Sequence, residues 1–73
     1  MATVMLSVPD ISCEHCERTI TNALTAEPGI RSVEVDIPRK QVRVYYDEAQ
    51  TSVAQMETVL KDEDYPVASA TPA

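Results

Sequence analysis

Two cysteines separated by two residues are the part of this 73-residue chain best suited to chemistry. They lie in Ser12-Cys13-Glu14-His15-Cys16, where a short strand pattern gives way to the pattern of an amphipathic helix. Backbone N–H groups and the dipole at a helix N-terminus stabilise thiolates. Such a pair can hold a soft metal ion or exchange disulfides, and the rest of the sequence must decide between these functions.

The metal that best suits this motif is Cu(I). Thiolates are soft ligands that select Cu(I), mercury or zinc over magnesium and calcium. We predict that Cys13 and Cys16 bind one Cu(I), because two nearly linear ligands are enough for this ion. Structural zinc requires four ligands, and the motif adds only His15. We expect His15 to point to solvent, because Cys16 packs inward in the same helical turn. His15 remains a candidate additional ligand in a metal-bridged dimer.

The composition restricts the partners and the cellular location. The net charge of -6, from twelve acidic and six basic residues, argues against nucleic acid and against an anionic membrane. A basic protein surface suits this charge better. One pair of closely spaced cysteines cannot cross-link a small secreted domain, and the first residues do not resemble a signal peptide. We therefore expect a cytoplasmic protein with reduced thiols and no insertion into a membrane.

Hydrophobic periodicity predicts four strands and two helices. Alternating apolar residues indicate strands over 4–8, 30–37 and 41–46, and helical spacing indicates helices over 16–26 and from Thr51 or Ser52 to about residue 60. Residues 65–68 read as a short edge strand in which proline is tolerated. We expect one domain over 1–68, followed by a frayed tail over 69–73.

The order β-α-β-β-α-β predicts an α+β fold of the ferredoxin-like type, a four-stranded antiparallel sheet with both helices on one face. Right-handed crossovers place the first and third strands in the centre. The loop after the first strand and the loop after the second helix then lie at the same end of the sheet. This topology predicts that Tyr65 lies near Cys13 and Cys16.

The complete pattern resembles the heavy-metal-associated domain, and within that family the bacterial copper chaperones. It consists of Val8-x-x-Ile11-Ser12-Cys13-x-x-Cys16, the helical residues Ile20, Ala23 and Leu24, Pro28-Gly29-Ile30-x-x-Val33-x-Val35 and Val42-x-Val44. The resemblance implies a metal carrier, not an enzyme, that passes Cu(I) to a CxxC site such as that of a copper-transporting P-type ATPase. It also implies that Tyr65 lies in the loop that faces the metal, without binding the ion itself.

Two departures from the family pattern affect the shape of the site. Asp10-Ile11 replaces the usual Gly-Met before the motif, and Asp64 replaces the usual glycine before Tyr65. We expect Ile11 to pack beneath the metal loop and Asp64 to adopt a left-handed conformation, which aspartate tolerates better than most residues.

Three alternative functions stay open at this point. The chain is also compatible with a metal-binding domain of a heavy-metal transporter, with a zinc or mercury binder, and with a thiol-disulfide oxidoreductase, since CxxC near a βαβ pattern is typical of redox proteins. Acidic residues flank the motif and precede Tyr65, and they predict a negative metal-bearing end that attracts a basic partner or simply keeps the protein soluble. These residues are Asp10, Glu14, Glu17, Asp62, Glu63 and Asp64.

Overall fold

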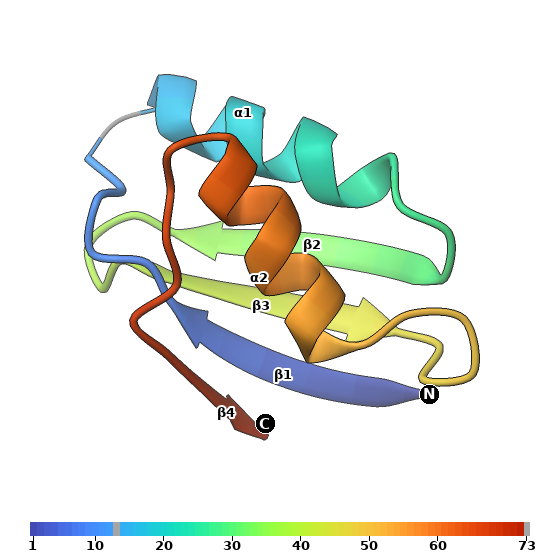
Figure 1. Ribbon diagram of the computed structural model, residues 1–73. Helices are drawn as coiled ribbons and strands as arrows, with labels where there is room; N and C mark the ends of the chain where they lie inside the picture. Colours follow the sequence, from blue (N-terminus) through green and yellow to red (C-terminus); the bar gives the residue numbers. More distant parts are fainter. Residues whose placement is uncertain (13, 73) are drawn as a thin grey trace.

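The computed structural model describes residues 1–12 and 14–72. Within them the chain forms the six elements that the sequence predicts, in the predicted order (Figure 1). They are β1 (Ala2–Ser7), α1 (Glu14–Thr25), β2 (Ile30–Asp36), β3 (Gln41–Tyr46), α2 (Val53–Asp62) and β4 (Ser69–Pro72). Neither described helix is long and apolar enough to cross a membrane.

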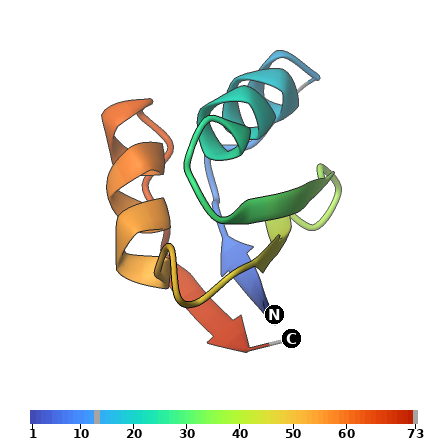
Figure 2. The same cartoon turned by 90° about the vertical axis from the view of Figure 1, so that its right-hand side faces the viewer.

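The strands form one antiparallel sheet in the order β2-β3-β1-β4, which confirms that the first and third strands are central. Val44 of β3 lies opposite Val4 of β1 on one side and opposite Val33 of β2 on the other. The alternating apolar residues of the three strands therefore share one face. Both helices cover that face, and no described residue forms a helix on the other face of the sheet (Figure 2). The ferredoxin-like fold is confirmed.

The core lies between this sheet face and the two helices. The buried side chains come from β1, β3, both helices and the β1–α1 loop, and the stripes that helical spacing predicted face inward on both helices. The buried apolar residues are Val4, Leu6, Val8, Ile11, Cys16, Ile20, Leu24, Val42, Val44, Met56 and Leu60. Hydrophobic burial at both helix stripes thus fixes how the helices lie on the sheet.

The prediction of the last strand was wrong in position. β4 begins at Ser69, and residues 65–68 are a connecting segment instead. Residues 69–72, which the sequence analysis placed in a frayed tail, pair with β1 from Ser7↔Ser69 to Val4↔Pro72. All four residues of β4 are exposed, so backbone hydrogen bonds to the open edge of β1 define this strand. Periodicity could not find it, because it has no hydrophobic alternation. Ala73 lies outside the described residues.

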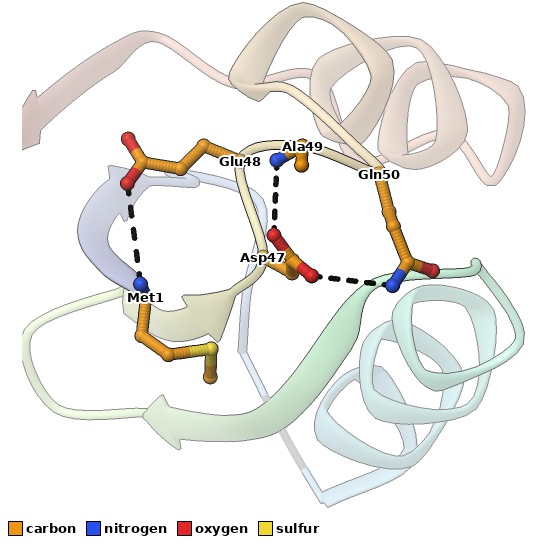
Figure 3. Close-up of polar contacts among 5 residues, drawn as sticks. All are labelled: Met1, Asp47, Glu48, Ala49 and Gln50. Atoms are coloured by element: carbon orange, nitrogen blue, oxygen red, sulfur yellow. Dashed lines mark hydrogen bonds and ion pairs between the residues drawn. The ribbon is translucent and has the colours of Figure 1, made fainter.

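The end of the molecule away from the cysteine motif is ordered by Asp47, in the loop between β3 and α2. Its carboxylate accepts hydrogen bonds from the Ala49 N–H at 3.0 Å and from Gln50 Nε2 at 3.2 Å, and the neighbouring Glu48 lies 4.0 Å from the N-terminal amine of Met1 (Figure 3). The Ala49 N–H is the main cause that lowers the pKa of Asp47 below its ordinary value of 3.8. The Asp47 N–H also donates to the Gly29 carbonyl at 2.7 Å, which joins this loop to the turn after α1.

Candidate metal centre

The loop between β1 and α1 is anchored from below by buried apolar side chains. Val8 and Ile11 are completely buried, so Ile11 packs beneath the loop as the sequence predicted. The Ile11 N–H donates to the Val8 carbonyl at 3.2 Å, and the Val8 N–H donates to the Lys40 carbonyl at 2.9 Å. The second bond ties the loop to the turn between β2 and β3. The loop is therefore held by its side chains and its backbone together.

Cys16 lies in the first turn of α1, on the stripe that continues through Ile20 and Leu24. Only 7% of this residue is exposed, and it belongs to the hydrophobic core. Ser12 Oγ lies 3.9 Å from Cys16 Sγ, within hydrogen-bond distance for sulfur. The position of Cys16 at a helix start is confirmed. Cys13 lies outside the described residues, so the geometry of the predicted pair stays a prediction.

His15 is exposed on the outer side of the first turn of α1, as the sequence predicted. Glu14 and Glu17 occupy the same turn, where carboxylates interact favourably with the positive end of the helix dipole. Among residues 1–12 and 14–72, no three histidine, cysteine or acidic side chains cluster to hold a metal ion. This part of the chain therefore offers no closed site of the structural zinc type, and a role for His15 as ligand stays a prediction.

Tyr65 is positioned by the way α2 ends. Asp64 has a φ of 67°, which confirms the left-handed conformation expected from the sequence. The Tyr65 N–H donates to the Leu60 carbonyl at 2.8 Å, and the Asp64 N–H donates to the Lys61 carbonyl at 3.0 Å. These two bonds form a Schellman motif, which ends the helix and turns the chain. Tyr65 is half-buried and packs against the core cluster to which Cys16 belongs.

Three loops lie at this end of the molecule: the β1–α1 loop, the β2–β3 turn and the segment after α2 (Figure 1). The sequence analysis identified the first and the third. It did not assign a role to the second, although Lys40 in this turn accepts the hydrogen bond from Val8. The predicted topology could have identified this turn, because antiparallel pairing of β1 with β3 brings the start of β3 beside the end of β1.

The pattern of the chain matches the heavy-metal-associated domain over residues 5–65. A relative named copper chaperone CopZ, from Staphylococcus haemolyticus, is 40% identical over 67 residues, which are 92% of this chain and 98% of the relative. The chain belongs to the heavy-metal-associated family. The resemblance drawn from the cysteine motif and the hydrophobic pattern is therefore confirmed.

Solved structures agree with this membership in the heavy-metal-associated family. A structure named CopZ metallochaperone superposes with a TM-score of 0.89 at 33% identity, and the match covers 92% of this chain and 100% of that one. A copper-binding domain from HMA7, a P-type ATPase, superposes with a TM-score of 0.87 over all of this chain and 95% of that domain. Its identity is 16%, so this second likeness concerns the fold alone.

Proposed function

We propose that this chain is a cytoplasmic copper carrier that binds one Cu(I) through Cys13 and Cys16 and passes it to a second protein. The observation that carries the proposal is the 40% identity to a protein named a copper chaperone, over nearly the full length of that protein. The position of Cys16 at the start of α1, next to a loop at one end of the molecule, supports it. The carrier is not an enzyme, since the metal is its cargo.

Transfer proceeds by exchange of thiolate ligands. A thiolate of the recipient adds to Cu(I) as a third ligand, one cysteine of the carrier then leaves, and the second exchange completes the transfer. No electron is gained or lost in these steps. A two-cysteine site leaves room for the incoming ligand, whereas a closed four-ligand site does not. The recipient is a CxxC site, such as that of a copper-transporting P-type ATPase, whose metal-binding domains include one with this fold.

Cys13 and Cys16 act as the metal ligands, and two neighbours have supporting roles. Tyr65 packs against the cluster that contains Cys16 and limits the access of water to the metal from the side of α2. His15 is exposed in the same turn as Cys16 and is available as an added ligand when two molecules share copper. The apo protein is a monomer in this proposal, and copper above one equivalent bridges two chains into a homodimer.

An anaerobic titration with Cu(I), in competition with a chelator of known affinity, tests the proposal. We expect one Cu(I) per chain, and we expect Cys13→Ser and Cys16→Ser each to reduce the affinity by several orders of magnitude. Because Cys16 is buried, unfolding of each variant in urea must show that the fold persists. Ser12→Ala is the matched control, since it removes the neighbour of Cys16 Sγ but neither thiol. Wild-type affinity in both cysteine variants would contradict the proposal.

Further measurements separate the alternatives. A zinc or mercury binder would prefer that ion when it competes with Cu(I) at equal concentration. A thiol-disulfide oxidoreductase would reduce insulin disulfides with turnover, whereas a carrier would show none. A transporter domain would bind Cu(I) in the same way, so the genomic context of the chain and the size of the native protein distinguish it.

A further inference from the structure

The end of the molecule that carries the cysteine motif has two sides of opposite charge. On one side, the turn between β2 and β3 exposes Arg39 and Lys40, and the Val8–Lys40 hydrogen bond holds this turn against the β1–α1 loop. On the other side, α2 ends in the exposed residues Asp62, Glu63 and Asp64. Figure 2 shows the turn and the end of α2 on opposite sides of the molecule.

The acidic residues of the sequence predicted a negative end, and Arg39 and Lys40 add a basic side to it. Arg39 lies 3.9 Å from Asp36, an exposed pair that offsets part of its charge. Lys40 makes no ion pair within the described residues. Its φ of 55° places its backbone in the left-handed region. Lys61 precedes the acidic run and offsets one of its three charges. The basic turn and the acidic end of α2 still have opposite net charges.

A surface with this polarity is complementary to a second copy of itself. When two molecules meet end to end, a two-fold axis perpendicular to the line between the charged loops sets the acidic side of each against the basic side of the other. An axis along that line would set like charges together. In a two-fold interface each contact occurs twice, so a modest attraction between one basic turn and one acidic helix end is doubled.

We propose that the occupant of this surface is a second copy of the chain, with Arg39 and Lys40 of each molecule facing Asp62 and Glu63 of the other across paired metal loops. The inference rests on the proposed copper-bridged dimer and adds the orientation of its two chains and the charged residues that determine this orientation. The copper ions hold the two loops together, and the charged sides select the axis. The preference for a second copy follows because both complementary surfaces occur on this one chain.

Charge-reversal variants of the full chain test the orientation. Asp62→Lys with Glu63→Lys makes both sides basic, and Arg39→Glu with Lys40→Asp makes both sides acidic. Aspartate is used at residue 40 because it tolerates the left-handed backbone there, and Asp64 is left unchanged for the same reason. The variant that combines all four substitutions swaps the two sides and keeps the wild-type net charge. Glu48→Lys with Glu57→Lys is the control for Asp62→Lys with Glu63→Lys, since it changes the net charge by the same amount on exposed residues outside the two charged loops.

Sedimentation equilibrium with excess Cu(I), without oxygen and at low salt, measures the dimer. We expect each one-sided variant to raise the dimer Kd about tenfold, because each exposed ion pair contributes little but every contact is present twice. The swapped variant should recover the wild-type Kd. An equal mixture of the two one-sided variants should form a heterodimer at least as tight as the wild-type dimer. All of these differences should shrink as the salt concentration rises.

The outcomes distinguish this inference from the proposed function. Failure of the wild-type chain to bind Cu(I) would overturn the proposed function and, with it, the inference. Normal Cu(I) binding with a monomer at every copper loading would overturn only the inference. A dimer Kd that depends on net charge alone would also overturn only the inference. In that case the control variant would match Asp62→Lys with Glu63→Lys. Variants that slow copper transfer to a recipient but leave the dimer unchanged would assign the surface to the recipient instead.

Discussion

Asp64 is a strained residue at the end of α2, and we expect its replacement by glycine to stabilise the protein. Its φ of 67° lies in the left-handed region, which costs an L-residue roughly 1–2 kcal/mol, with aspartate at the low end. Glycine removes this cost but loses about 0.5–1 kcal/mol more entropy on folding. Removing a carboxylate from the negative end of the helix dipole adds about 0.3–1 kcal/mol. The sum predicts a gain of about 1 kcal/mol in the free energy of unfolding.

Thermal unfolding of the apo protein measures this effect. A gain of about 1 kcal/mol raises the Tm of a domain of this size by roughly 4–8 °C. Asp64→Asn removes the charge but keeps a residue that tolerates the left-handed region, so it isolates the electrostatic part. Asp64→Ala removes the charge and keeps the backbone strain, so it should be less stable than the glycine variant by about 1 kcal/mol.

The comparison between glycine and alanine decides the outcome. Equal stability of the two variants would refute the reasoning, because the backbone conformation at Asp64 would then not limit stability. We also expect Asp64→Gly to leave the Cu(I) affinity unchanged, since the bond from the Tyr65 N–H to the Leu60 carbonyl uses only backbone atoms. A changed affinity would mean that residue 64 shapes the metal loop through its side chain.

Three further predictions concern the far end of the molecule. The hydroxyl of Thr51 is buried with no hydrogen-bond partner among the described residues, so Thr51→Val should raise the free energy of unfolding in urea by about 1 kcal/mol, and a loss would reveal a partner for the hydroxyl. At Gly29 the φ is +90° and an added Cβ would lie 2.8 Å from the Cβ of Gln50, so Gly29→Ala should cost at least about 2 kcal/mol in the same assay. The hydrogen bond from the Ala49 N–H lowers the pKa of Asp47 in the folded state. Ionised Asp47 therefore stabilises the fold fully above the ordinary pKa of 3.8, and this contribution is lost as the pH falls through the lower pKa of the folded state. Asp47→Asn should therefore flatten the acid limb of a stability–pH curve, and an unchanged limb would contradict this cause.

Much of the fold could be predicted because local patterns and tertiary contacts agree. Val4, Leu6 and Val8 alternate in sequence and are buried together, and Ser52 caps α2 by accepting a hydrogen bond from the Gln55 N–H at 3.3 Å. The left-handed conformation at Asp64 was predictable from the resemblance to the family, which usually has glycine at this position before Tyr65. Of the candidate site, the sequence predicted a helix start at the motif, and the structure places Cys16 there. The pairing of Cys13 with Cys16 at a metal stays a prediction.

Periodicity reveals only those elements whose side chains divide between core and solvent. Five elements divide in this way, namely β1, α1, β2, β3 and α2, so the amino-acid sequence by itself determined them and the motif at the start of α1. β4 does not, because its exposed residues are held by backbone hydrogen bonds that leave no hydrophobic pattern in the sequence, and only the open edge of β1 decided where it lies. The separation of the basic β2–β3 turn from the acidic end of α2 was likewise decided by the tertiary structure. Arg39 and Asp62 are 23 positions apart in the chain, and only the packing of α2 on the sheet sets the basic turn and the acidic helix end on opposite sides of the end that carries the cysteine motif.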